Sequence, residues 1–194
     1  RYLHGNAIVH GDMKTANILV TSSGRCKLSD FGLSTWRQTH ATNATGAGGL
    51  GTWAYLSPEL LQGSPSSEKS DVYALAIVSS ELSSAAQPFS GRPHFEISAA
   101  VRRGERPHLS EPGSAMGQLI TQSWASDPTA RPCAREMLEA LIVLTPAAAD
   151  PNAASIAPME DEEDTISDNV VAAAAAAAAA PSRASLEPTT SEAK

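Results

Sequence analysis

Hydrophobic positions in the first part of the chain come in short runs rather than in helical periods. Runs rich in aliphatic residues cover 7–9, 17–20 and 25–29, and the last two flank a polar turn that contains Gly24. Two such runs around a short polar turn are typical of a β-hairpin. The pattern therefore predicts a hairpin early in the chain, with a shorter strand before it.

Helical spacing replaces this pattern from Ser57 onward. Ser57 followed by Pro58 and an acid predicts a helix start, and Ser70 is expected to open a second, buried helix. That buried helix is expected to hold the apolar run 72–82, and the remaining helices are expected over 95–101, 116–124 and 132–144. Residues 33–56 have no period, which predicts a long loop; loops of that length are usually functional or disordered.

The last fifty residues differ in composition from the rest. Residues 145–194 combine prolines, the acidic run 160–164 and nine consecutive alanines, and they lack the apolar surface that a packed core requires. We expect them to form a disordered acidic, alanine-rich tail, with an ordered domain over 1–144. The longest apolar run, 170–180, has 11 residues. A membrane span needs about 20 residues, so no span is expected.

Charge narrows the classes of partner. The net charge of −7 comes from the tail, because residues 1–144 hold 12 basic and 12 acidic residues. A neutral body argues against nucleic acid as a partner, since such binders usually carry a basic patch. Cys26 and Cys133 are too few for a disulfide framework and lack metal-ligand spacing. They suit a reducing compartment, so we expect a cytoplasmic, intracellular location.

Three oxygen-bearing side chains flank the predicted hairpin. Asp12 and Asn17 precede it and Asp30 follows it, so the hairpin returns the chain to the same end of the sheet. Carboxylate and amide oxygens gathered in this way suit Mg²⁺, which also keeps positions for water and phosphate. Lys14 adds a cation to the same loop. The set predicts phosphoryl transfer: one acid accepts a proton, the others hold metal, and the lysine offsets phosphoryl charge.

The same residues resemble motifs of the protein kinases. Residues 10–17, His-Gly-Asp-Met-Lys-Thr-Ala-Asn, resemble the catalytic loop H-R-D-L-K-x-x-N; residues 30–32 match D-F-G, and Ser57-Pro58-Glu59 resembles A-P-E. Further matches follow in kinase order at 71–73, 104–107 (G-x-R-P) and 124–132 (W-x-x-D-P-x-x-R-P). Six matches in order are far more specific than any one of them.

This resemblance implies an α+β, protein kinase-like fold. Residues 1–144 would be the large, mostly helical C-lobe with its short catalytic β-hairpin, running from the catalytic loop to the last helix. The small N-lobe, with its glycine-rich loop and lysine, is expected to be absent from this chain and supplied elsewhere in the full-length protein. We therefore expect the chain alone to bind Mg·ATP poorly and to be inactive by itself.

The implied activity is that of a protein serine/threonine kinase using ATP and Mg²⁺ on a protein substrate. Lys14, two residues after the catalytic aspartate, and Gly51-Thr52 resemble Ser/Thr kinases, whereas the ending from Trp124 to Pro132 is more typical of tyrosine kinases and their relatives. The combination resembles the tyrosine-kinase-like group.

Carried over by position, the resemblance implies a role for each candidate residue. Asp12 would be the base that accepts the substrate hydroxyl proton. Asn17 and Asp30 would hold the Mg²⁺ ions bound to ATP. Lys14 would neutralise the γ-phosphate, and Thr52 would hold Asp12 and Lys14 in register while shaping the substrate site.

Other matching positions are expected to bind the base of ATP or to stabilise the fold. Leu19 would form part of the adenine floor. Asp71 is expected to hold the catalytic-loop backbone, and Arg131 with Glu59 to form a buried structural ion pair. Trp124, at helical spacing, is expected in the core.

Three positions depart from the family pattern: Gly11 replaces the arginine of H-R-D, Ser57 the alanine of A-P-E, and Ala76 a usual glycine. None of them removes a catalytic oxygen. Because Gly11 cannot pair with a phosphate, we expect activation to be independent of phosphorylation in the segment 39–45. The alternative to an enzyme is a catalytically silent, kinase-like interaction module with the acidic tail as a docking segment; the intact acid–amide–lysine set favours the enzyme.

Overall fold

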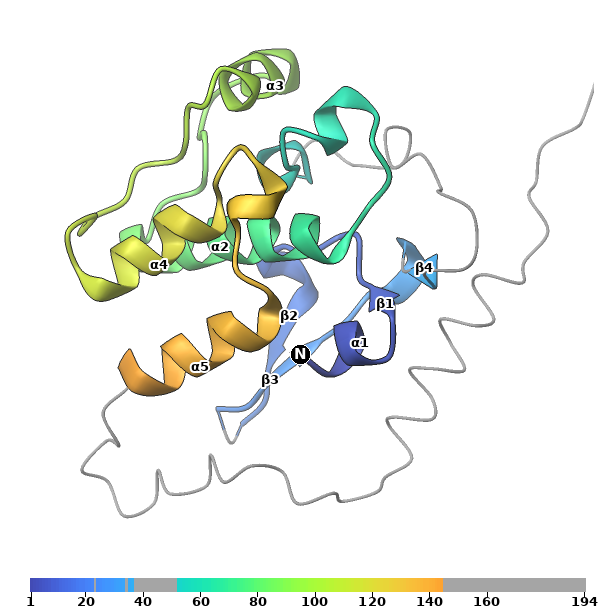
Figure 1. Cartoon of the computed structure of the whole chain (residues 1–194). Coiled ribbons are helices and arrows are strands. Elements are labelled where there is room, and N and C mark those ends of the chain that lie inside the picture. The colour runs from blue at the N-terminus through green and yellow to red at the C-terminus, as the bar shows by residue number, and fades with distance from the viewer. Residues whose placement is uncertain (23, 34, 37–51, 145–194) are drawn as a thin grey trace, which may run out of the picture.

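Short strands and single 3₁₀ turns make up the first part of the molecule, and α-helices make up most of the rest (Figure 1). The computed structural model describes residues 1–22, 24–33, 35–36 and 52–144. The predicted tail and most of the predicted long loop therefore lie outside the described residues. Within those ranges, every helix is too short or too polar to cross a membrane.

The predicted hairpin is confirmed. Strand β2 (Ile18–Val20) pairs antiparallel with β3 (Cys26–Leu28), with Ile18 opposite Leu28. A second two-stranded pair joins β1 (Ile8–Val9) to β4 (Thr35–Trp36). Strand β4 falls where the sequence predicts only loop. It has two residues, and its partner lies far away along the chain, so no local pattern marks it.

One short α-helix precedes these strands, and the other α-helices of the described chain follow them. The α-helices are α1 (Tyr2–Gly5), α2 (Glu68–Ser84), α3 (His94–Arg102), α4 (Ala115–Ser123) and α5 (Ala134–Leu144). Single 3₁₀ turns are η1 (Thr15–Asn17), η2 (Phe31–Leu33), η4 (Thr52–Tyr55), η5 (Leu60–Gln62) and η6 (Pro128–Ala130). The fold is thus mostly helical, with little sheet.

Helix α2 starts earlier than the sequence predicts. Ser67, not Ser70, is the N-cap: its hydroxyl oxygen accepts from the Ser70 N–H at 3.2 Å, while the Ser67 N–H donates to the Ser70 hydroxyl at 2.9 Å. This reciprocal pair is a capping box, which satisfies two of the helix's first N–H groups. The earlier start puts Asp71 inside the first turn of α2, facing the loop that follows β1.

The prediction of a helix that starts at Ser57 is wrong. The chain forms a turn there, followed by the single 3₁₀ turn η5, which ends at Gly63 with φ 88°. Ser57 itself is fully buried and caps no helix. The cause is tertiary: Glu59 is held by Arg131, and a left-handed glycine ends a helical turn.

Helix α2 is central to both apolar clusters of the described chain. Tyr73 and Ile77 belong to the larger one, together with residues of η4, α3 and α4, and Trp124 lies in it as expected. Val72 packs against Leu119 and Met137 in a smaller cluster between α2, α4 and α5. The helices therefore form a rigid base under the loops that follow β1 and β3.

An ion pair stabilises the junction between these helices. Arg131 is fully buried and donates to both oxygens of the Glu59 carboxylate, at 2.7 and 2.8 Å. It also donates to the carbonyls of Ala125 and Lys69, at 2.8 Å each, and lies 5.0 Å from the centre of the Tyr73 ring. The expected structural ion pair is therefore present, and its guanidinium is fully used.

Candidate active site

A carboxylate of helix α2 fixes the loop after β1. Asp71 accepts hydrogen bonds from the backbone N–H groups of His10 at 2.9 Å and Gly11 at 3.0 Å, and it lies 2.9 Å from the His4 ring nitrogen Nε2. Gly11 has φ 79°, a left-handed conformation that glycine adopts without strain. Asp71 thus holds the backbone on the N-terminal side of Asp12, as expected.

Asp12 is bound through only one of its two oxygens. Its Oδ2 accepts from the Lys14 ammonium at 2.6 Å and from the Asn17 amide at 3.1 Å. The same amide donates to the Asp12 carbonyl at 2.8 Å. Its Oδ1 is buried and has no hydrogen-bond partner among the described residues. A buried carboxylate oxygen without a partner is costly, and this atom is able to accept a further hydrogen bond.

Thr52 joins this group from a distant part of the chain. The Lys14 ammonium lies 3.3 Å from its hydroxyl, and Thr52 is buried at the start of η4. The structure therefore brings four of the candidate residues, Asp12, Lys14, Asn17 and Thr52, into one hydrogen-bonded network.

A second set of polar contacts supports this network, and sequence reasoning missed it. The Tyr55 hydroxyl donates to Glu81 at 2.7 Å and lies 3.1 Å from the Thr15 hydroxyl. Burial and, less strongly, Glu81 raise the pKa of Tyr55 to about 12, so the hydroxyl stays protonated. These contacts connect the loop after β1, η4 and α2. No local pattern marks the three residues, because they are far apart in sequence.

Asp30 lies beside this network without a hydrogen bond to it. Its carboxylate is exposed, and its backbone has φ 60°. The preceding Ser29 donates to the Asn17 carbonyl through its N–H at 2.9 Å and through its hydroxyl at 3.1 Å. The next residue, Phe31, has its ring 5.0 Å from the ring of His10. The hairpin thus brings Asp30 next to Asn17, and the exposed Asp30 carboxylate accepts a hydrogen bond from the nearby Gly32 N–H at 3.3 Å.

The donor set is compatible with a divalent ion shared with a phosphate ligand. The Asn17 amide directs its nitrogen to Asp12, and its oxygen has no partner among the described residues. Within the described ranges, no three His, Cys, Asp or Glu side chains gather to hold a metal. Mg²⁺ is typically bound by one or two protein oxygens together with phosphate and water, which this set fits.

Leu19 lies apart from these polar residues, on strand β2. It is 55% exposed, and its neighbours Val20 and Leu28 are also exposed. The hairpin therefore presents apolar side chains to solvent next to Asp30. The register places Leu19 on one face of the hairpin and Val20 and Leu28 on the other, so both faces expose apolar side chains.

Comparison with known proteins matches these features to one family. The family described as protein tyrosine and serine/threonine kinase matches residues 1–141. This range includes every candidate residue named above.

Individual relatives agree with this family. The chain is 38% identical over 144 residues to "Probable serine/threonine-protein kinase drkC" of Dictyostelium discoideum, covering 72% of this chain and 19% of that protein. It is 36% identical to serine/threonine/tyrosine-protein kinase HT1 of Arabidopsis thaliana, covering 68% and 33%. It is also 36% identical to human mitogen-activated protein kinase kinase kinase 7, covering 71% and 23%.

The chain thus spans a fifth to a third of the length of these three curated relatives. With a family match over most of its length and a loop geometry that holds an acid, an amide and a lysine together, the chain belongs to the protein tyrosine and serine/threonine kinase family.

Proposed function

We propose that this chain carries the catalytic loop of an ATP-dependent protein serine/threonine kinase of the tyrosine-kinase-like group. The observation that carries the proposal is the asymmetry of Asp12. One oxygen is held by Lys14 and Asn17, and the other is buried without a partner among the described residues. A general base needs this arrangement, with a fixed carboxylate and one oxygen free to take a proton.

In the proposed reaction, the Oδ1 atom of Asp12 accepts the proton of a serine or threonine hydroxyl on the protein substrate. The hydroxyl oxygen then takes the γ-phosphoryl group of ATP, and ADP leaves. Lys14, which contacts both Asp12 and Thr52, offsets charge on the transferred group. Thr52 keeps Lys14 in position and borders the substrate site.

Asn17 and Asp30 are the proposed ligands of Mg²⁺. Bound Mg·ATP would supply the phosphoryl group and neutralise its developing charge. The chain's own contribution is to hold the two ligand oxygens on either side of the hairpin. The exposed carboxylate of Asp30 and the uncommitted oxygen of Asn17 support this assignment.

The proposed domain is a kinase C-lobe over residues 1–144, followed by a tail over 145–194. Leu19 would form part of the floor under adenine. Its exposure on β2 supports contact with a covering surface, which a small N-lobe elsewhere in the full-length protein would provide. Two free cysteines support a reducing, intracellular location.

The experiment is a phosphotransfer assay on the full-length protein that contains this chain, with Mg·ATP and a serine- and threonine-containing protein substrate. Asp12→Asn is compared with Asp127→Asn, an exposed aspartate that caps η6. We expect phosphoserine and phosphothreonine from wild type and from Asp127→Asn, and a loss of about 10²–10⁴-fold in Asp12→Asn. No transfer by wild type would reject the proposal in favour of a silent interaction module, and full activity of Asp12→Asn would reject Asp12 as the base.

A further inference from the structure

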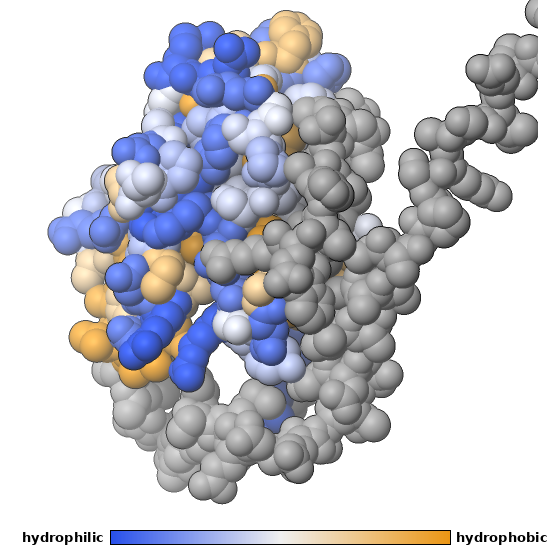
Figure 2. Space-filling view, turned by 45° about the vertical axis from the view of Figure 1, so that its right-hand side comes forward, coloured by the Kyte–Doolittle hydropathy of each residue, from blue (hydrophilic) through white to orange (hydrophobic). Residues whose placement is uncertain are grey.

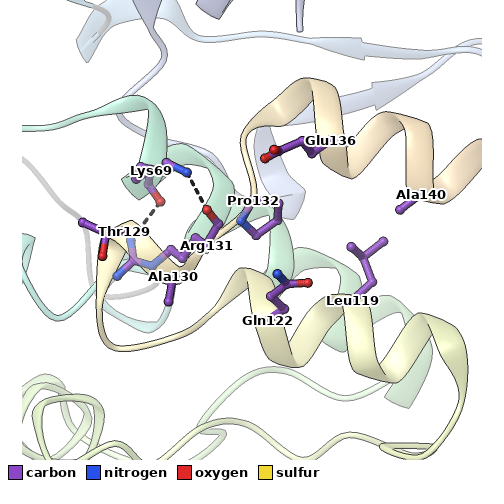
Figure 3. A pocket seen from close by; sticks show the side chains of 9 residues that line it. All are labelled: Lys69, Leu119, Gln122, Thr129, Ala130, Arg131, Pro132, Glu136 and Ala140. Carbon is purple, nitrogen blue, oxygen red and sulfur yellow. Dashed lines mark hydrogen bonds between the residues drawn. The ribbon is translucent and has the colours of Figure 1, made fainter.

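A hollow between helices α4 and α5 has polar groups that bond to the chain itself (Figure 3). The Lys69 ammonium donates to the Arg131 carbonyl, and Glu136 accepts from the Cys133 N–H at 2.7 Å. None of the described residues that line this hollow is aromatic. Its contacts therefore serve the fold, whereas a second surface feature, at the start of α3, has contacts of another kind.

Three aromatic side chains form a row where α3 begins. The His94 ring lies 5.3 Å from the Trp53 ring, tilted by 39°, and 6.1 Å from the Phe95 ring, at 86°. Aromatic pairs prefer ring centres about 4.5–7 Å apart, so both contacts are favourable. These three residues are the aromatic row, and they join η4 to α3.

The aromatic row is only partly covered by the rest of the molecule. Trp53 is half-buried, His94 is exposed, and Phe95 is 63% exposed. Helix α3 faces the core through other residues, among them Ile97 and Val101. Figure 2 shows hydrophobic surface at the top of the molecule, the end at which Figure 1 shows α3. Aromatic side chains are enriched where proteins bind one another, so this surface is suited to a protein partner.

The aromatic row starts beside the proposed substrate site. Trp53 follows Thr52 directly in η4, and the Thr52 hydroxyl lies 3.3 Å from the Lys14 ammonium. That ammonium in turn donates to Asp12, the proposed base. An extended peptide rises about 3.3 Å per residue. A peptide whose hydroxyl reaches Asp12 therefore passes the aromatic row within a few residues.

The chemistry of the aromatic row suits an uncharged side chain. Arg92, the cation nearest to the row in sequence, is already paired with Glu105. It also lies over the Phe89 ring, 5.7 Å from the ring centre. The rings of Trp53 and Phe95 thus remain as contact surface, and aromatic rings bind other rings and large apolar groups.

We propose that the aromatic row binds an aromatic or large aliphatic side chain of the protein substrate, within about four residues of the phosphorylated serine or threonine. Phe95 is the specificity-determining residue of this contact, because its ring is exposed and lies outside the core. This inference rests on the proposed function and names the substrate class of the same site.

Peptides that differ at one position test the proposal on the full-length protein. A Phe is placed one to four residues before or after a Ser acceptor in an alanine and glycine background, and a reference peptide has Ala at every variable position. We expect kcat/KM with Mg·ATP to be at least about tenfold above the reference for one or more Phe peptides. A gain below about threefold at every position would overturn the proposal. So would a larger gain from Lys, which would assign recognition to the exposed acid Glu96.

Variants of Phe95 separate recognition from folding. Phe95→Ala should reduce the preference to below about threefold, and Phe95→Tyr should keep it, because the ring is retained. The matched control is Ile142→Ala, which removes a side chain that is 62% exposed on α5, far from α3 in Figure 1. It should leave the preference unchanged. If Phe95→Ala kept the full preference, or if Ile142→Ala abolished it equally, the aromatic row would not be the recognition site.

A binding measurement keeps this inference separate from phosphotransfer. The same peptides, with Ala in place of the acceptor Ser and with a fluorescent label, are titrated with the protein in the absence of ATP, and anisotropy gives Kd. At least one Phe peptide should bind about tenfold more tightly than the reference, and Phe95→Ala should remove this difference. If wild type transfers no phosphate, the proposed function fails, and the dissociation constants still decide the inference: equal values for all peptides would overturn it.

Discussion

Two buried acid–cation pairs in this chain differ in how many of their carboxylate oxygens are hydrogen-bonded. Arg131 and Glu59 share two hydrogen bonds, and the guanidinium has further carbonyl partners. Asp12 and Lys14 share one contact, and the second oxygen of Asp12 has no partner among the described residues. Arg131 and Glu59 lie 72 residues apart in the sequence, whereas Asp12 and Lys14 lie two residues apart in one loop.

The difference separates a pair that stabilises the fold from one that is open to a ligand. Folding favours satisfied polar groups, because an unpaired buried oxygen costs roughly 1–3 kcal/mol. Among the described residues, buried side-chain atoms without a partner are Asp12 Oδ1 and the hydroxyls of Ser57, Tyr73 and Ser123, and of these only the Asp12 oxygen is a carboxylate atom in the candidate site. The comparison predicts that mutation of the first pair affects stability and mutation of the second affects chemistry.

Arg131→Ala should give the largest change. It leaves the Glu59 carboxylate, whose side chain is 17% exposed, without its partner, and breaking a buried pair typically costs about 3–5 kcal/mol. Chemical denaturation should show this loss directly. The matched control is Arg135→Ala, which removes an exposed ion pair with Glu139 and should cost under about 1 kcal/mol. Equal losses in the two variants would contradict a structural role for the buried pair.

Asp30→Ala should weaken nucleotide binding while sparing the fold. In the full-length protein we expect at least about a tenfold loss of Mg·ATP affinity, or about 1.4 kcal/mol, because the proposed metal ligand is removed. The carboxylate is exposed and holds no other segment in place, so the melting temperature should stay close to that of wild type. Calorimetric titration measures the affinity, and an unchanged affinity would remove Asp30 from the metal site.

Acid should destabilise the fold in part through Glu59. Burial acts to raise the pKa of this carboxyl, but the two hydrogen bonds from Arg131, with help from its own backbone N–H, hold that pKa below its usual value. The folded state therefore prefers the ionised form. The resulting stability is present above the unfolded pKa of 4.5 and is lost as pH falls through the lower folded value.

Melting curves between pH 3 and pH 7 check this for wild type and Glu59→Gln. The variant should be less stable at pH 7 and should lose less stability on acidification. A wild-type acid response that Glu59→Gln leaves unaltered would exclude Glu59 as its source.

Phosphorylation of the segment 39–45 should have the smallest effect. Gly11 offers no cation for a phosphate to pair with. We expect the triple variant Thr39→Ala, Thr42→Ala, Thr45→Ala of the full-length kinase to keep activity within about threefold, which is under roughly 0.7 kcal/mol. A hundredfold loss would mean that another cation replaces the missing arginine.

Local sequence signals predicted part of the fold. The hairpin over β2 and β3 has both a strand pattern and a turn, and the four longer helices have apolar periods. Their starts were less predictable, because Ser67 and Ser70 are both good N-caps and only packing selects the first. The turn after Ser57 has a helix-start pattern but is set by the contact of Glu59 with Arg131.

The candidate site was predictable where its residues are close in sequence. Asp12, Lys14 and Asn17 share one loop, so their spacing alone indicates a common site. Contacts between distant segments give no such signal. The hydrogen bond from Tyr55 to Glu81 and the pairing of β4 with β1 follow only from the folded chain.

The most direct test of the central contrast is to measure turnover and unfolding free energy on the same two variants, Asp12→Asn and Glu59→Gln, in the full-length protein. Asp12→Asn should lose about 10²–10⁴-fold in turnover with under about 1 kcal/mol of stability, because Lys14 remains partly exposed and retains its contact with Thr52. Glu59→Gln should lose more stability than Asp12→Asn while its folded fraction keeps turnover near wild type. If Asp12→Asn instead lost stability and kept its turnover, the unpartnered oxygen would not mark the reacting atom.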